Sequence, residues 1–247
     1  MERTARLTRN RTGHTRPERN FAMKDFANSA AASELTMTKK LSNDDAPALT
    51  VTITYPEFSE IPETAKKRLN RFYRQAAFEY MHRCEKDLFP EAAQYVNEAA
   101  ENGMSYRPWN AVMTSSVTFN SGGVLSARRD IAETIPGGRV MRLRFGDTWD
   151  LNTGFPLAAD AFYPKRAKVK KQLRAFTVDS AEKLLSPGGG RLKQSVKRLI
   201  RKNFDIENFH LGGGGLEIFY QDDAIEQAEG GAAFVLPWGE SGPFLPA

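Results

Sequence analysis

The stretch FGDTWDLNTGFPLAADAF, Phe145 to Phe162, links an aromatic strand end to a turn rich in Asp, Asn and Gly. The turn, Asp150-Leu-Asn-Thr-Gly154, begins like a calcium-binding loop. In such a loop Gly stands at position six and an acid at position twelve, whereas here Gly154 stands at position five and Ala161 at position twelve. Asp and Asn side chains often bond the main chain two residues on, and Gly accepts a positive φ. The stretch therefore predicts a tight structural turn and not a calcium site.

A hydrolase-like site is the alternative interpretation of the same region. Acid–base catalysis needs paired carboxylates, and Asp147, Asp150 and Asp160 lie within or beside the turn. If these carboxylates meet in a sheltered cleft, the enzyme interpretation gains; if they accept main-chain N–H groups around a turn, it loses.

Three runs of alternating apolar and polar residues precede the turn and predict strands. They cover residues 109–120, 124–133 and 139–149, and short links with Gly-Gly, at 121–123 and 136–138, separate them. Such links between alternating runs are typical of hairpins. The sequence thus predicts a three-stranded antiparallel meander with one face toward a core.

An earlier strand and two helices are predicted before the meander. Residues 49–55 alternate strictly, and Pro56 is expected to end that strand. Apolar residues at spacings of three and four between 61 and 88 then predict a long amphipathic helix. Pro90 is expected to break it before a shorter helix capped by Asn102-Gly103.

The region after the turn is helical and strongly basic. Lys165–Lys202 holds thirteen Lys or Arg against two acidic residues. Apolar stripes, with Val169 and Leu173 on one helix and Val196 and Ile200 on the next, predict helices that cover a sheet while their basic faces stay solvated. Nucleic-acid binding by this basic face is an alternative interpretation.

Short strands complete the pattern between residues 203 and 238. Gly212–Gly215 separates two of them as a hairpin turn, and neither this cluster nor Gly188–Gly190 fits a phosphate-binding loop. The order of strands and helices predicts an α+β fold with antiparallel sheets, in which amphipathic helices cover the three-stranded meander.

The first 48 residues differ from the rest of the chain. They hold nine basic and six acidic residues, few large apolar side chains and no period. We expect a disordered basic tail over 1–48, a folded domain over 49–240 and a short tail over 241–247. Met23 and Met37 leave open a translation start further downstream.

Composition restricts the chemistry. No apolar run is long enough to span a membrane and no secretory signal is apparent, so the expected location is the cytoplasm. The single cysteine, Cys84, excludes an internal disulfide and a multi-cysteine metal site, and the three histidines lack ligand spacing. No catalytic residue, metal or cofactor is predicted, and a non-catalytic role is favoured over an enzyme.

An ordered series of segments resembles the domain-of-unknown-function 3298 (DUF3298) family. The series starts with the meander, which ends in Asp150–Gly154 and Asp160–Phe162. After the helical region it continues with Gly215–Tyr220 and, before Trp238, with Phe234–Pro237. The family includes the C-terminal domain of the lysozyme-sensing anti-sigma factor RsiV and the accessory region of the deacetylase PdaC. The resemblance implies a non-catalytic recognition or sensory module that binds a protein or cell-wall-like ligand.

The resemblance directs attention to five candidate binding residues and to two departures. The candidates are Trp149, Asp150, Asn152, Asp160 and Tyr220. Family members commonly carry Gly-Gly-Ala-His between the second and third meander strands, whereas this chain has Ile-Ala-Glu-Thr-Ile-Pro-Gly-Gly at 131–138. Known relatives also act outside the membrane, so lysozyme recognition does not carry over to this sequence.

Overall fold

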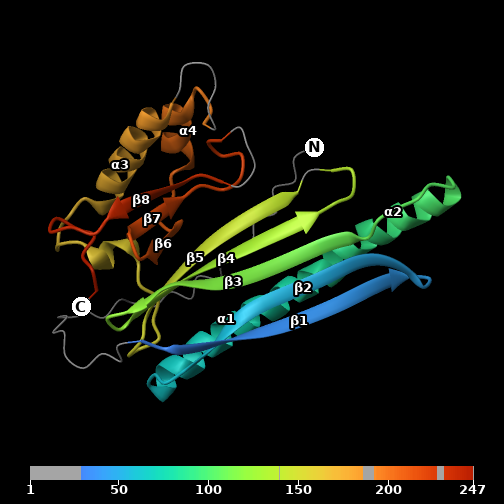
Figure 1. Ribbon diagram of the computed structural model, residues 1–247, viewed down its shortest axis with the longest axis horizontal. Helices are drawn as coiled ribbons and strands as arrows, with labels where there is room; N and C mark the ends of the chain where they lie inside the picture. Colours follow the sequence, from blue (N-terminus) through green and yellow to red (C-terminus); the bar gives the residue numbers. More distant parts are fainter. Residues whose placement is uncertain (1–28, 139, 186–191, 227–230, 247) are drawn as a thin grey trace.

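A computed structural model describes residues 29–138, 140–185, 192–226 and 231–246 (Figure 1). Its larger part is a five-stranded sheet in the order β1-β2-β3-β4-β5. The strands are β1 Ala31–Asn43, β2 Ala46–Ser59, β3 Trp109–Ser121, β4 Val124–Thr134 and β5 Met141–Asp150. The predicted meander is confirmed as β3, β4 and β5, which pair antiparallel.

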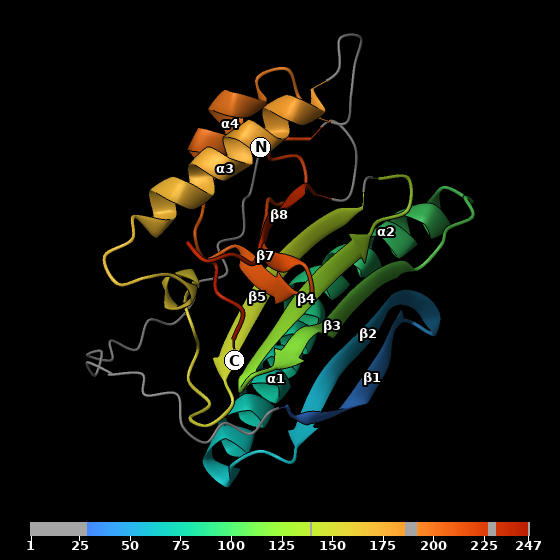
Figure 2. The same ribbon diagram turned by 60° about the vertical axis from the view of Figure 1, so that its left-hand side comes forward.

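The β2–β3 pair is parallel, contrary to the all-antiparallel expectation. Parallel neighbours need a crossover, because the chain must return to the end of the sheet where the first strand began. The long helical segment supplies that crossover. Helices α1, Glu63–Arg83, and α2, Phe89–Glu101, lie along one face of the sheet and bury the first core against it (Figures 1 and 2).

The prediction of a disordered tail up to residue 48 is wrong for its second half. Residues 31–43 form β1, which pairs antiparallel with β2 along its whole length. Its apolar residues Leu35, Met37 and Leu41 are half-buried against the first core, although they are too few to give a clear pattern in the sequence. Met37 lies in the middle of the strand. Residues 1–28 of the expected tail lie outside the described residues.

Two prolines act differently from the prediction. Pro56 does not end its strand: β2 continues to Ser59, and Pro56 lies beyond Thr54, where pairing with β3 stops. A proline is tolerated at such a position because the missing N–H affects only one neighbour. Pro90 does not break the helix either, since the five-residue π-helical turn Cys84–Leu88 joins α1 directly to α2 just before it. A widened turn accommodates the absent N–H and the bulk of the ring.

The smaller part of the molecule is a three-stranded antiparallel sheet covered by helices. Strands β6 Phe209–Gly212, β7 Gly215–Phe219 and β8 Ala233–Pro237 lie side by side. Helices α3, Val169–Leu184, and α4, Val196–Asn203, cover this sheet through the predicted apolar stripes, and the 3-10 turn Ala159–Phe162 adds to the same second core. The α+β class is therefore confirmed.

The two parts meet at β4 and β5. Strand β6 contacts both of these strands, and the small sheet to which it belongs lies on the face opposite α1 (Figure 2). A Cβ added to Gly146 would lie 1.7 Å from the carbonyl oxygen of Phe209, so the two backbones are in direct contact. The N–H of Leu211 donates to Oγ of Ser126 at 2.9 Å, and Ser126 is also 2.8 Å from the hydroxyl of Thr148. Strands β4 and β5 thus lie between the two cores.

Candidate functional site

The turn after β5 is built by its own polar groups. Oδ1 of Asp150 accepts the N–H groups of Asn152 at 2.9 Å and Thr153 at 3.3 Å. The N–H of Gly154 donates to the carbonyl of Asp150 at 2.7 Å, and Gly154 has a φ of +66°. The prediction of a structural turn is confirmed, because the Asp150 carboxylate accepts main-chain N–H groups.

The same turn is held against the start of α1. A Cβ on Gly154 would lie 2.7 Å from Cα of Ala65, so only glycine fits this approach. The guanidinium of Arg68 lies 4.0 Å from the centre of the Phe155 ring and donates to the carbonyl of Thr153. The turn therefore fixes the end of β5 to the helix that covers the first core.

The five predicted binding residues lie in different surroundings. Trp149 is buried in the first core, where its indole N–H donates to the hydroxyl of Tyr73 at 3.2 Å. Tyr220 is buried in the second core, with its hydroxyl 3.5 Å from that of Thr177. Asn152 is half-buried in the turn beside Asp150, and Asp160 is exposed on the 3-10 turn. Only the three neighbours Trp149, Asp150 and Asn152 lie together.

A groove lies between α1, β5 and the loop that precedes β6; we call it the α1–β5 groove. Its volume is about 480 Å³. Its floor and walls are largely apolar or aromatic, and its rim is polar. The lining includes Phe72, Ala76 and Tyr80 of α1, Met113 of β3, Ile131 of β4 and Phe145 of β5, with a rim of Gln75, Glu79, Arg83, Asp205, Glu207 and Asn208.

Arg129 of β4 also lines the groove. Its guanidinium lies between two aromatic rings, 5.2 Å from the centre of Phe72 and 5.0 Å from that of Phe145. Nε and Nη2 donate to the Asp147 carboxylate at 2.6 and 3.3 Å. Burial acts to lower the pKa of Arg129, but the charge of Asp147 and the hydrogen bonds to it outweigh burial and raise this pKa. No described residue accepts a hydrogen bond from Nη1.

A second buried pair stands at the rim. Both terminal nitrogens of Arg83 donate to the Glu133 carboxylate, one of them at 3.2 Å, and the hydroxyl of Tyr80 donates to the same carboxylate at 3.3 Å. The hydrogen bonds to Glu133 raise the pKa of Arg83. Two guanidinium groups that line one groove are thus held in fixed positions by buried carboxylates.

Sequence reasoning did not single out Arg129 or Glu133. Both alternate with the buried Ile131 on the face of β4 that meets the helix. Charged residues at strand positions that face the core are unusual, and this could have indicated a buried ion pair. Asp147 was considered only as a catalytic carboxylate. The pairing itself depends on the register of β4 with β5, in which Ala127 stands opposite Asp147 and Arg129 reaches it diagonally.

Tyr220 lines a smaller hollow beside the outer edge of β5. This hollow has a volume of about 260 Å³, and Arg144 and Gln221 line it as well. The Gln221 amide accepts the N–H of Arg144 at 2.9 Å and donates to its carbonyl at 2.7 Å. The side chain of Gln221 therefore occupies the place of a neighbouring strand.

Two side chains of chemical interest, Cys84 and His210, are buried, and their pKa values are shifted by burial. Burial raises the pKa of the Cys84 thiol to about 12. Burial and the charges of Arg128 and Arg144 lower the pKa of His210 to about 4. Among the residues that the structure describes, no three His, Cys, Asp or Glu side chains gather as a metal site. In the same part of the chain, no helix is both long and apolar enough to cross a membrane.

Comparisons with known proteins give structural neighbours only. No family model matches the sequence, and no curated protein matches it. A DUF3298 family member from Bacteroides fragilis superposes with a TM-score of 0.62 at 17% identity, over 86% of this chain and 92% of the other. A DUF3298 family protein from Pseudomonas aeruginosa superposes with a TM-score of 0.50 at 16% identity, over 87% of this chain and 92% of the other. The chain has the fold of these two structures.

Proposed function

We infer that this chain is a member of the DUF3298 family and propose that it is a non-catalytic recognition module that binds a protein or cell-wall-like ligand in the α1–β5 groove. The resemblance read from the sequence and the shared fold with two DUF3298 structures support the family assignment. We propose that the module serves as a sensory domain, as in RsiV, or as an accessory region, as in PdaC.

The observation that carries the proposal is the arrangement around Arg129. Its guanidinium is held by Asp147, lies between two rings, and keeps Nη1 without an acceptor among the described residues. A fixed donor in an apolar groove can recognise a carbonyl or carboxylate group of a ligand. Peptides and the peptide stems of cell-wall polymers both present such groups.

The carboxylates argue against the hydrolase-like alternative. Asp147 neutralises Arg129, and Asp150 accepts main-chain N–H groups within its turn. Asp160 lies on an exposed turn that packs with the second core. Hydrolysis by a carboxylate pair needs two groups that converge on one substrate atom, whereas Asp147 and Asp150 have separate structural partners and Asp160 is exposed on a different turn.

The groove can be tested with two probes. Soluble peptidoglycan fragments and a short peptide with a free C-terminal carboxylate should be titrated separately into the isotope-labelled full chain, and amide NMR shifts followed. We expect one of them to shift residues on both sides of the groove, such as Ala76 and Phe145. An Ala76→Trp variant should fill the groove and weaken that binding at least tenfold.

The matched control is Ala175→Trp, an exposed alanine on α3 in the other part of the molecule. It should bind as the unmodified chain does. The proposal fails if neither probe binds at millimolar concentration, or if Ala76→Trp binds as well as Ala175→Trp.

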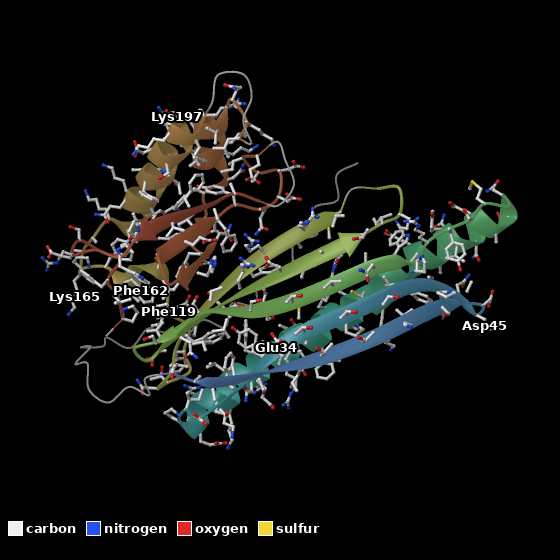
Figure 3. All side chains as sticks on the ribbon, viewed as in Figure 1. Glu34, Asp45, Phe119, Phe162, Lys165 and Lys197 are labelled. Carbon is white, nitrogen blue, oxygen red and sulfur yellow. The ribbon has the colours of Figure 1, made fainter. Side chains whose placement is uncertain are left out.

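A second candidate function is contact with nucleic acid through the basic face. A hollow of about 300 Å³ lies between α3 and α4, and its lining includes Lys171, Arg174, Lys197 and Arg201 (Lys197 is labelled in Figure 3). Part of this charge is neutralised, because Lys197 lies 2.6 Å from Glu182. Phosphate contacts would make binding to a single-stranded oligonucleotide fall steeply with added salt. Absence of binding at low salt would end this candidate.

A further inference from the structure

Within the described parts of the chain, strand β1 is an edge of the five-stranded sheet that no further strand covers. It is thirteen residues long and, among the described residues, pairs with β2 alone (Figures 1 and 2). The opposite edge, β5, is covered: Gln221 bonds the main chain of Arg144, and the N–H of Leu157 donates to the carbonyl of Thr148 at 2.7 Å. A long strand with a free row of N–H and C=O groups is a template for another strand.

The sequence of β1 is complementary to itself about Met37. If a second β1 runs antiparallel with Met37 opposite Met37, Glu34 stands opposite Lys40 and Thr36 opposite Thr38, and the symmetry repeats each pair. All four side chains lie on one face of the strand and are exposed. Opposite charges and paired threonines across neighbouring strands are favourable contacts. Figure 3 labels Glu34 on this outer strand.

The other face of the same edge carries apolar side chains together with the exposed Lys39, which pairs with Glu85. Leu35 and Met37 are half-buried there against the first core. Phe78 of α1, 54% exposed, belongs to the same flank. Arg74 and Glu85 lie on the same helix face as Phe78. Arg74 is 3.6 Å from Glu57 of β2, and Glu85 is 2.5 Å from Lys39 of β1, so this helix face lies beside the β1 edge.

We propose that two copies of this chain pair antiparallel through β1, with a two-fold axis at Met37. The five strands of each copy then form one continuous ten-stranded sheet. The axis is perpendicular to the sheet, so both α1 helices lie on the same face and Phe78 of each copy approaches Leu35 and Met37 of the other. Lysines on an edge usually oppose strand addition. Here each Lys40 stands opposite Glu34 of the other copy, and only a second β1 strand in this register pairs the two charges in this way.

A charge-reversal cycle tests the pairing in the full chain. Sedimentation equilibrium should show a dimer of the unmodified protein. Lys40→Glu places glutamates opposite one another twice, and Glu34→Lys does the same with lysines, so each variant should raise the dissociation constant about tenfold or more. The double variant Glu34→Lys with Lys40→Glu should restore the original value. Lys170→Glu on α3 is the control for net charge and should have no effect.

Cross-linking tests the register. Met37→Cys brings two thiols to the axis, at a Cα separation that a disulfide spans, and should give a covalent dimer under oxidation. Lys40→Cys places its two thiols about six strand residues apart, or roughly 20 Å, and should not cross-link. The buried Cys84 does not compete. A monomer at 0.2 mM, a dimer indifferent to Lys40→Glu, or equal cross-linking of both variants would each overturn the proposal.

Discussion

Nε of Arg129 on β4 lies 2.6 Å from Oδ2 of Asp147 on β5, and the pair lies between helix α1 and the sheet, with Asp147 buried and Arg129 half-buried. Asp147 is 4% exposed. The buried carboxylate is tolerated because Arg129 neutralises it, and the rings of Phe72 and Phe145 pack on the guanidinium. Arg129 lines the α1–β5 groove, so the pair links the geometry of the groove to the stability of the first core.

Removal of one partner of this pair should destabilise the fold strongly. Arg129→Met leaves the Asp147 carboxylate buried without a partner, and we expect a loss of about 3–5 kcal/mol in the free energy of unfolding. The double variant Arg129→Met with Asp147→Leu removes both charges and should recover most of that loss. Urea denaturation at pH 7 measures all three proteins. If the single and double variants are equally unstable, the carboxylate is not the source of the loss.

The turn at Asp150 should depend on one side-chain oxygen. Asp150→Ala removes the acceptor of two main-chain N–H groups and should cost about 1–3 kcal/mol in the free energy of unfolding. Asp150→Asn keeps an oxygen at the same place and should cost much less. Comparison of the two variants by thermal unfolding separates a turn-forming role from a role that needs the charge. Equal losses would point to the charge.

The meander and its turn could be predicted because their signals are local. Alternation, Gly-bearing links and the Asp-Asn-Gly turn each act within a few residues, and β3, β4, β5 and the Asp150 turn follow them. Strand β1 could not be recognised in this way. It is polar on its outer face, and its few apolar residues become meaningful only when β2 and the helices lie beside it.

The groove could not be predicted because it depends on contacts between distant segments. Its lining joins Phe72, Arg129 and Phe145 with the loop near Asn208. The parallel register of β2 with β3 places α1 over the sheet, and the contact of β6 with β5 brings the loop before β6 to the groove. Neither pairing has a signal within one segment. The sequence could identify the residues of the turn, but not which strands would surround it.

The contact between the two parts of the molecule should depend on Gly146. The methyl group of Gly146→Ala would overlap the carbonyl of Phe209, which is main-chain and cannot turn aside. We expect this variant to separate β6 from β5. Overpacking of this kind lowers the free energy of unfolding by about 1–3 kcal/mol, so the unfolding midpoint should fall by several degrees or more. Gly213→Ala is the control, since nothing lies within 4 Å of its added methyl group. Equal midpoints for the two variants would show that the contact can relax.

His210 should make stability fall in mild acid. Its pKa is lowered to about 4 in the fold by burial and by Arg128 and Arg144, against about 6.5 in the unfolded chain, so the unfolded chain binds more protons between these values. The contribution of neutral His210 is complete above pH 6.5. It is lost as pH falls toward 4, by up to roughly 3 kcal/mol for a shift of this size.

The neighbouring Glu217 acts in the opposite direction. Its carboxylate lies 3.6 Å from Nε2 of His210, yet burial raises the pKa of Glu217, so its protonation stabilises the fold below its folded pKa. The imidazole stays neutral at this distance because burial and the two arginines outweigh one half-buried carboxylate. His210→Gln removes the titrating group and keeps Glu217. Urea midpoints at pH 7, 6, 5 and 4.5 should therefore decline less steeply for His210→Gln than for the unmodified chain, and parallel declines would mean that His210 is charged in the fold or does not titrate in this range.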